Sequence, residues 1–239
     1  MNDLSVSVVL PVRNGEAFIA DRLAEVSAYV STHTEAYEII VVDDGSTDRT
    51  VEVAVQTRYQ NLVLVRHAAN QGKGAAVRQG MLQATYAWVL FADADLSIPM
   101  ATFDAFQDAL AYDIIIGSKS MPNSRALVRP PWARRVASRA FNLWVRGLAV
   151  RGICDTQGGF KAFRKPVAQH LFAQQTLTSY AFDVEILYLA RKYQYRVKEI
   201  PMTWSYSQST TLNLLNGPMR MFVHVAKIRL HDLQGRYSR

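Results

Sequence analysis

The sequence contains almost no cysteine and no long apolar run. Cys154 is the single cysteine among 239 residues, which excludes an internal disulfide and is typical of a reducing compartment. No apolar stretch approaches the roughly 18 residues that a membrane-spanning helix needs. The first residues also lack the basic and apolar regions of a signal peptide. We therefore expect a cytoplasmic protein, which leaves binding to the surface of a membrane open.

Acidic side chains are scarce in the second half of the chain. Residues 1–118 contain 7 Lys or Arg and 15 Asp or Glu, a net charge of −8, whereas residues 119–239 contain 20 and 5, a net charge of +15. Such an excess is either a solvated basic surface or a contact with something anionic. Lipid headgroups, a phosphorylated substrate and nucleic acid are the candidates. We favour an acidic, metal-binding half followed by a basic, partner-binding half.

Strand and helix patterns alternate in the first half. Runs of apolar β-formers predict strands at 6–11, 38–42, 62–66, 88–91 and 113–117, with helices between them near 16–30, 48–56, 75–85 and 101–111. Strands separated by helices of this length indicate βαβ units. The sequence thus predicts an α/β fold with a Rossmann-like, mostly parallel sheet flanked by helices.

The pattern changes after residue 118. Residues 121–131 predict a loop, and residues 132–150 predict an amphipathic helix. Seven arginines and no acidic residue lie between Arg125 and Arg151. This helix either packs its apolar face on the core or lies among lipid headgroups, and we favour the membrane contact. Further elements are expected at 181–193 (helix), 196–204 (strand) and from 217 onward (helix).

Acidic clusters follow two of the expected strands. Asp43 and Asp44 come after 38–42, and Asp93 and Asp95 come after 88–91. In open α/β sheets the carboxyl ends of the strands border the crevice that binds the ligand. Two carboxylates one residue apart suit a hard divalent cation, Mg²⁺ or Mn²⁺, that also holds a diphosphate. The pattern therefore predicts a metal site in an enzyme that uses a nucleotide sugar.

Three further segments have both a structural and a ligand-binding interpretation. The loop 11–16 either turns into a helix or contacts a base and ribose, and Lys73 in 70–78 either opens a helix or touches a base or phosphate. The segment 155–163 is either a turn before a short strand or a backbone loop close to a ligand, with Gln157 free to bind a sugar hydroxyl. The five histidines lack metal-ligand spacing and are interpreted as structural or surface residues.

Eight segments carry a family resemblance by their residues and their order: SVVLPVRNGE, VVDDGSTDRT, NQGKGAAVRQG, FADADLS, IIIGSK, DTQGGFKAF, AFDVEIL and IPMTW. They resemble the motifs of inverting family 2 glycosyltransferases, and most of all those of dolichyl- or polyprenyl-phosphate glucosyltransferases and mannose synthases. The resemblance runs from about Val6 to Trp204. It implies a glycosyltransferase A-type fold, a nucleotide-diphosphate sugar donor, Mg²⁺ or Mn²⁺, and a polyprenyl or dolichyl phosphate acceptor.

The resemblance also implies roles for single residues. The donor is expected at Pro11, Arg13, Glu16, Asp43, Asp44, Lys73, Asp93, Ala94, Asp95 and Gln157, the metal at Asp93 and Asp95, and the acceptor phosphate at Lys119, Arg134 and Ser138. Ser97 stands where mannose synthases usually have a glutamine, which favours UDP-glucose over GDP-mannose. The segment 207–212 lacks a lysine that relatives often carry. Residues 1–118 then form a nucleotide-sugar-binding half, 119–216 an acceptor-binding half of the same domain, and 217–239 a C-terminal amphipathic basic helix.

A phosphate acceptor needs little help from a general base, because it is already largely anionic near neutral pH. Positioning and relief of charge repulsion are the expected catalytic contributions, from Asp95, Lys119 and Arg134. Asp183 is the candidate if a base is used; because Asp183 and Glu185 lie two apart on a helix, only one of them is expected to face the site. Attack opposite the leaving diphosphate inverts the anomeric centre. The enzyme is expected at the cytoplasmic face of a membrane, with a membrane protein partner or a second copy left open.

Other functions compete with this interpretation. A transferase of the same fold could add sugar to a polysaccharide or another glycan, and would then require a base. A nucleotidyltransferase would want a glycine- and arginine-rich opening loop, which the segment VLPVRNGE is not. A nucleic-acid-binding module would explain the basic half but would leave Asp93 and Asp95 without a role, so we expect no nucleic-acid partner.

Overall fold

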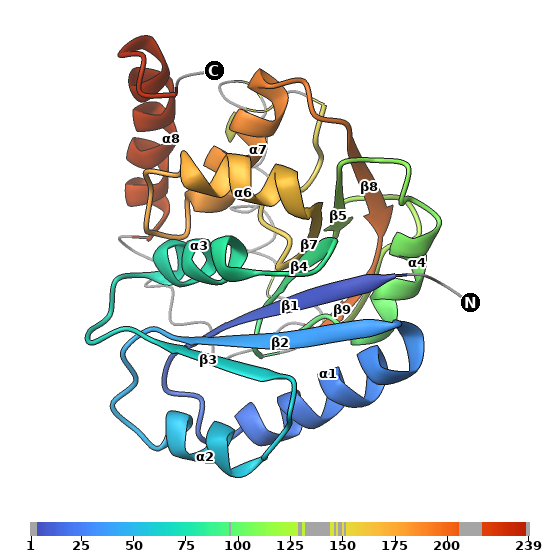
Figure 1. The fold of residues 1–239 in the computed structure, drawn as a ribbon. Helices are drawn as coiled ribbons and strands as arrows, with labels where there is room; N and C mark the ends of the chain where they lie inside the picture. Colours follow the sequence, from blue (N-terminus) through green and yellow to red (C-terminus); the bar gives the residue numbers. More distant parts are fainter. Residues whose placement is uncertain are drawn as a thin grey trace.

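A seven-stranded sheet forms the centre of the molecule (Figure 1). The computed structural model describes residues 4–95, 97–128, 131, 144–145, 147, 150, 152–205 and 217–237. The strands in spatial order are β3 (Leu62–Arg66), β2 (Ala36–Asp43), β1 (Ser5–Val12), β4 (Trp88–Ala92), β7 (Phe160–Arg164), β5 (Ile114–Ser118) and β8 (Val197–Pro201). All neighbours pair in parallel except β7, which is antiparallel to both β4 and β5. The predicted mostly parallel α/β sheet is confirmed.

Helices cover both faces of this sheet. They are α1 (Ile19–His33), α2 (Thr50–Gln56), α3 (Lys73–Gln83), a short 3₁₀ helix η1 (Met100–Phe103) with α4 (Asp104–Gln107), α6 (Lys165–Ala173), α7 (Phe182–Lys192) and α8 (Gly217–Leu233). In Figure 1, α3, α6 and α7 lie on one side of the sheet and α1 on the other. The apolar residues of β1 alternate accordingly: Val9 packs in the cluster with α3, while Val8 and Leu10 pack in the cluster with α1.

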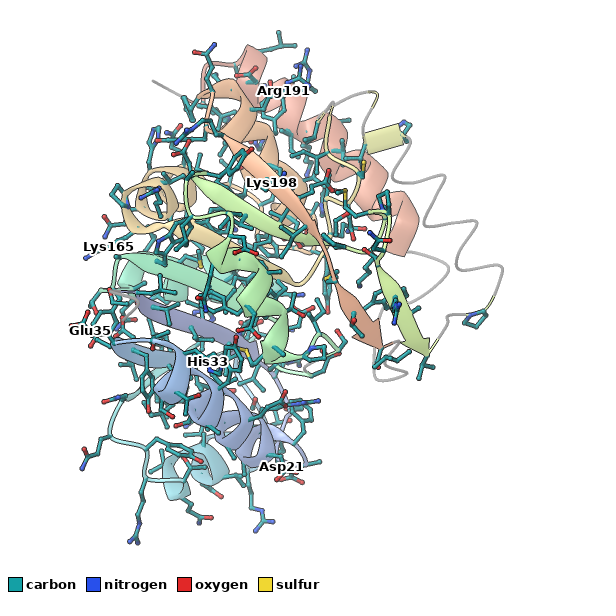
Figure 2. All side chains as sticks on the ribbon, turned by 90° about the vertical axis from the view of Figure 1, so that its right-hand side faces the viewer. Asp21, His33, Glu35, Lys165, Arg191 and Lys198 are labelled. Carbon is teal, nitrogen blue, oxygen red and sulfur yellow. The ribbon has the colours of Figure 1, made fainter. Side chains whose placement is uncertain are left out.

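The second half departs from the sequence prediction in several elements. The expected loop 121–131 contains a strand, β6 (Arg125–Val128), which pairs in parallel with β9 (Thr203–Ser205). Figure 2 shows this pair side by side, next to the end of β8, the edge strand that carries the labelled Lys198. The expected strand 196–204 is therefore two strands, because the chain leaves the main sheet at Met202, whose carbonyl accepts a hydrogen bond from the Arg125 amide (3.0 Å).

Three other elements differ from the prediction. The expected helix 101–111 ends early, as η1 and α4. The segment 155–163 does lead into a short strand, β7, although residues 155–159 form bends rather than the expected turn. The sequence did not predict α6, which has Pro166 in its first turn. The expected helix 132–150 lies almost wholly outside the described residues. Among the described residues, no helix is long and apolar enough to cross a membrane.

The C-terminal helix packs on the domain itself. Val225 and Ile228 of α8 are fully buried in the same apolar cluster as α3, α6 and α7, and α8 lies against α7 (Figure 1). The opposite side of α8 exposes Val223, Leu230 and Leu233. The helix that the sequence predicts from residue 217 is therefore present and amphipathic.

The order of the strands creates a switch point beside β1. The chain builds β2 and β3 on one side of β1 and then crosses over to build β4 on the other. Connections leave β1 and β4 in opposite directions, and in open α/β sheets the ligand crevice lies at the carboxyl ends of such strands. The acidic clusters after β2 and β4 border this crevice.

Close packing between α3 and β1 fixes one wall of that crevice. A Cβ atom on Gly80 would lie 2.4 Å from Cγ1 of Val9 and 3.1 Å from Cγ2 of Val42. We expect Gly80→Ala to lower the free energy of unfolding by about 1–3 kcal/mol, because the helix must move away from the sheet. Urea titration measures the change. Gln79→Ala, at the exposed neighbouring position, should stay within about 0.5 kcal/mol of the parent protein; equal values for both variants would contradict the close packing.

Candidate active site

The crevice is bordered by the ends of three neighbouring strands. Asp43 is the last residue of β2, Asp93 directly follows β4, and β1 lies between them. Their side chains come from segments about fifty residues apart in the chain, and only the strand order brings them together. The carboxyl edge of the sheet therefore carries the acidic residues that the sequence analysis singled out.

Asp44 holds a loop rather than facing the crevice freely. Its Oδ1 accepts a hydrogen bond from the Gln71 amide (2.8 Å) and contacts Nδ1 of His67 (2.9 Å), and its Oδ2 accepts one from the Gly72 amide (2.9 Å). These contacts fix the segment that leads from β3 into α3. His67 is buried and supports this loop through Asp44. No spacing of residues in the sequence indicated this role.

Asp43 differs from Asp44 in having a free acceptor. The side chain is fully buried, and Oδ1 accepts a hydrogen bond from the Ser46 amide (3.1 Å). Oδ2 lies 3.5 Å from Nε of Arg66 but has no hydrogen bond to any described residue. A buried carboxylate oxygen without a donor is costly. Asp43 therefore has a buried oxygen that a ligand N–H or O–H would satisfy.

The first loop is tied to the loop after β2. Asn14 has a positive φ of 52°; its amide donates to Ser46 Oγ (2.8 Å) and its Oδ1 accepts from the Thr47 amide (2.9 Å). The Glu16 carboxylate accepts from the Arg49 amide (2.9 Å). Glu16, expected to bind the donor, thus has a partner within the protein. Arg13 is exposed and makes no hydrogen bond or ion pair to another described residue, and Pro11 lies within β1.

Two ion pairs lie side by side behind the crevice. Nζ of Lys73 is 2.6 Å from Oδ1 of Asp93, and Nζ of Lys161 is 2.6 Å from Oδ1 of Asp183. We call these four residues the charge quartet. Lys161 and Asp183 are almost fully buried, with side chains 2% and 7% exposed. The ring of Phe91 lies between the two ammonium groups, 5.4 Å from Lys73 and 5.8 Å from Lys161.

The charge quartet shifts the protonation of its own members. Burial raises the pKa of the Asp183 carboxyl, against the opposing effect of Lys161 and Lys73. Burial alone would lower the pKa of Lys73, but the Asp93 and Asp183 carboxylates outweigh it and raise that pKa above its usual value. Lys73 thus carries positive charge at neutral pH. Of the two acids in α7, Asp183 faces the site and Glu185 does not, as the sequence predicted for one of them.

Glycines allow Asp93 to take its place. A Cβ atom on Gly159 would lie 2.0 Å from Oδ2 of Asp93, and one on Gly158 would lie 2.3 Å from the Gly117 carbonyl. The Asp93 amide also donates to the Gly159 carbonyl (3.0 Å). The two glycines therefore let β7 approach β4 and β5, whereas the ligand-binding interpretation of 155–163 assigned that close approach to a ligand.

Asp155, which the sequence analysis did not select, connects the residue after β5, the segment before β7, and β8. Its Oδ2 accepts from the Lys119 amide (2.9 Å), its Oδ1 accepts from the Gln157 amide (3.1 Å), and its own amide donates to Oε1 of Glu199 (3.1 Å). Nζ of Lys119 lies 4.9 Å from the centre of the Trp204 ring. Lys119 and Gln157 are therefore brought together by a buried aspartate whose only signal was its place before two glycines.

Ala94 and Asp95 follow the end of β4. Oδ1 of Asp95 accepts a hydrogen bond from the Ser97 amide (3.1 Å), and the backbone carbonyl of Asp95 accepts one from the guanidinium of Arg22. The sequence gave no reason to choose Arg22. Ala94 between the two acids is buried. Arg134 and Ser138, expected to bind the acceptor phosphate, lie outside the described residues.

The side chains of Asp93 and Asp95 offer carboxylate oxygens, the type of ligand that a hard divalent cation prefers. No group of three or more His, Cys, Asp or Glu that could hold a metal ion occurs among the described residues. Mg²⁺ is commonly held by one or two carboxylates together with substrate phosphates and water, so two carboxylates suffice when a diphosphate is bound. Oδ1 of Asp93 also lies 2.6 Å from the Lys73 ammonium.

Removing Lys161 should be costly. Lys161→Met leaves the buried Asp183 without its partner, and we expect the free energy of unfolding to fall by about 3–5 kcal/mol. The double variant Lys161→Met/Asp183→Leu should recover part of that loss, because an apolar pair replaces the charges. Urea titration of both, beside Lys198→Met at an exposed lysine of β8, measures the effect. A single variant as stable as Lys198→Met would show that the buried pair contributes little.

Comparison with known proteins identifies the family to which the chain is similar. The model of the glycosyl transferase family 2 matches residues 7–172. The chain is 35% identical over 219 residues to a dolichyl-phosphate beta-glucosyltransferase of Drosophila melanogaster, covering 84% of this chain and 67% of the relative. A protein of the same name from Dictyostelium discoideum is 29% identical over 253 residues, covering 98% and 77%.

Solved structures share the fold. Glucosyl-3-phosphoglycerate synthase from Mycobacterium tuberculosis, in complex with Mn²⁺ and uridine-diphosphate-glucose, superposes with a TM-score of 0.67 at 17% identity, over 94% of this chain and 78% of that one. Mannosyl-3-phosphoglycerate synthase from Rubrobacter xylanophilus gives a TM-score of 0.71 at 19% identity, over 99% and 76%. The glycosyltransferase A-type fold implied by the sequence resemblance is confirmed. With a family model matched across most of its length and acidic strand ends around a switch-point crevice, the chain belongs to the family 2 glycosyltransferases.

Proposed function

We propose that this family 2 glycosyltransferase moves glucose from UDP-glucose to a polyprenyl or dolichyl phosphate with inversion of the anomeric centre. The observation that carries the proposal is that relatives named dolichyl-phosphate beta-glucosyltransferase match 84–98% of the chain at 29–35% identity. The geometry of the crevice supports the donor half of this proposal, and the charge of residues 119–239 supports the acceptor half.

Asp43 is the proposed contact to the nucleotide base. Its buried Oδ2 has no donor among the described residues, and the imino N–H of a pyrimidine such as uracil supplies one. Asp44 then acts through the loop that it holds, since its carboxylate already accepts two backbone amides. Exposed Arg13 is available to the diphosphate or ribose, whereas Glu16 supports the loop from behind.

Asp93 and Asp95 are the proposed carboxylates for Mg²⁺ or Mn²⁺. A bound divalent cation would neutralise charge on the diphosphate as it leaves. Lys73 contributes a second positive charge beside Asp93 (2.6 Å), and its raised pKa keeps that charge at neutral pH. Gln157, positioned through Asp155 (3.1 Å), is the proposed contact to the sugar.

The acceptor phosphate supplies its own negative charge for attack on the anomeric carbon, with its second pKa about 6. Lys119, Arg134 and Ser138 are the proposed phosphate contacts, and they serve to position it and to relieve repulsion from the donor diphosphate. Asp183 is an unsuitable base in this arrangement, because its carboxylate is buried and ion-paired with Lys161. We propose instead that it balances the charge of the two lysines.

The lipid acceptor requires the enzyme to reach a membrane surface, and we propose peripheral binding at the cytoplasmic face. Exposed apolar side chains support this: Leu127 and Val128 of β6 are 65% and 53% exposed, and Leu230 and Leu233 of α8 are 50% and 83% exposed. Basic residues accompany them in the half of the chain with net charge +15, which favours contact with anionic headgroups.

A transfer assay tests the proposed reaction. The protein is incubated with Mg²⁺ or Mn²⁺, labelled UDP-glucose or GDP-mannose, and a polyprenyl phosphate in detergent. We expect label from UDP-glucose to move into the organic phase, and Asp95→Ala to lower the rate by at least about a hundredfold, because the carboxylate that would hold the metal is lost.

The controls separate the donor from the acceptor. Transfer from GDP-mannose alone would contradict the choice of sugar. No transfer from either sugar, with UDP-glucose still bound in calorimetry, would contradict the lipid phosphate and point to another glycan acceptor. An unchanged rate in Asp95→Ala would contradict the metal site.

Asp43→Asn tests the base contact. The substitution replaces the acceptor Oδ2 with an NH2 group, which is itself a donor and cannot accept the N–H of the base. We therefore expect the KM for UDP-glucose to rise about tenfold or more while kcat changes little. Steady-state kinetics at saturating acceptor give both constants. Asp113→Asn is the matched control, since Asp113 pairs with Arg196 where β5 meets β8; the idea fails if both variants leave KM at the parent value.

A further inference from the structure

The loop Gln175–Tyr180 packs on the start of α3, where Lys73 is located. The Gly74 amide donates to the Thr178 carbonyl (2.8 Å), and Nε2 of Gln175 donates to the Gly74 carbonyl (2.9 Å). The fit is close, since a Cβ atom on Gly72 would lie 2.5 Å from the Thr178 oxygen. The ring of Tyr180 lies 5.6 Å from Nζ of Lys73. The position of this loop thus determines where Lys73 stands beside Asp93.

Glu185 holds that loop from inside the protein. It is fully buried in α7, yet it pairs with no lysine or arginine among the described residues. Its Oε1 accepts from the Thr176 amide (3.0 Å) and from the Thr176 hydroxyl, and its Oε2 accepts from the Leu177 amide (2.8 Å). A buried carboxylate is stabilised by such donors, and here they come from the loop.

The end of the chain supplies a further donor. The Tyr237 hydroxyl donates to Oε1 of Glu185 (2.6 Å) across 52 residues, and the Tyr237 side chain is buried. Burial and the contact with Glu185 raise the pKa of Tyr237, so the hydroxyl keeps its proton. Lys192 binds the Tyr237 carbonyl (2.9 Å) and the Asp232 carboxylate, which fixes the turn after α8.

Two histidines of α8 contact the same loop. Nδ1 of His224 lies 2.8 Å from the Ser179 hydroxyl, and Nδ1 of His231 lies 3.0 Å from the Thr176 hydroxyl. Since Val225 and Ile228 bury the inner face of α8 in the core, these contacts are held by the packing of the helix. Three side chains of the C-terminal segment therefore bear on this loop: His224 and His231 contact it directly, and Tyr237 contacts it through Glu185.

We propose that Tyr237 and Glu185 form a C-terminal latch, which positions the loop Gln175–Tyr180 and, through it, Lys73 for the donor diphosphate. Both are positioning residues, because neither touches the substrate in this arrangement. The part that concerns catalysis rests on the proposed function, in which Lys73 meets the donor phosphates. The part that concerns the loop rests on the hydrogen bonds alone.

Tyr237→Phe tests the latch with little change in volume. Tyr195→Phe is the matched control, since it also removes one tyrosine hydroxyl in contact with a partly buried partner, here Nδ1 of His170 at 2.7 Å. Hydrogen exchange of the intact protein is measured by mass spectrometry. We expect the amides of Gly74, Thr176 and Leu177 to exchange at least about threefold faster in Tyr237→Phe and to be unchanged in Tyr195→Phe. Equal exchange in the two variants would overturn the latch, whether or not the protein transfers sugar.

Kinetics then test the link to Lys73. In the transfer assay we expect Tyr237→Phe to raise the KM for UDP-glucose about three- to tenfold, with a smaller change in kcat, and Tyr195→Phe to match the parent. In a Lys73→Met background, Tyr237→Phe should have no further effect on KM, because both changes act through the same ammonium. A KM effect of the same size in both backgrounds would overturn the proposed route through Lys73. Absence of transfer in the parent protein would count against the proposed function, while the exchange result would still decide the latch.

Discussion

Neutralising buried charge at the end of β4 is the constraint on which the rest of the site depends. Lys73 and Lys161 bring two positive charges to Phe91, and Asp93 and Asp183 bring two negative charges (Lys73–Asp93 and Lys161–Asp183, 2.6 Å each). Removing one member would leave an unpaired charge in a place that water reaches poorly. The four residues come from α3, the residue after β4, β7 and α7, so these elements must meet in one arrangement for the charges to cancel.

Backbone packing makes that arrangement attainable. Gly159 lets β7 approach Asp93, and Gly72 and Gly74 let the loop Gln175–Tyr180 approach α3. A side chain at any of these positions would collide with a carboxylate or a carbonyl at 2.0–2.8 Å. The antiparallel strand β7, inserted between β4 and β5, is what carries Lys161 into an otherwise parallel sheet.

In the proposed function, the two halves of the chain contribute different parts of the site. The first half forms the parallel strands and the crevice, with Asp43 and Asp93 at its edge. The second half completes the site from outside: Asp155 fixes Lys119 and Gln157, and Glu185 fixes the loop beside Lys73. In this proposal the donor binds in the acidic half, whose carboxylates would hold the metal, and the acceptor phosphate binds in the basic half. The positive charges of the metal and the basic side chains would relieve the repulsion between the phosphates of the two substrates.

Sequence alone determined the strands around the crevice, the acidic ends of β2 and β4, and the family. Alternating apolar runs and carboxylates at strand ends are local patterns, which can be recognised in the sequence without knowing any tertiary contact. It did not predict β6, α6, the role of His67, or the partners of Glu16 and Asp44, and it left the glycines at 158–159 open between a turn and a close approach to a ligand. Tertiary structure decided these, because a carboxylate's role depends on which donors the fold brings within about 3 Å of it. Asp43 and Asp44 are adjacent in sequence, yet one has a free buried oxygen and the other is fully occupied by backbone amides and His67. That difference arises from the direction of each side chain at the end of β2, which the order of residues along the chain does not contain.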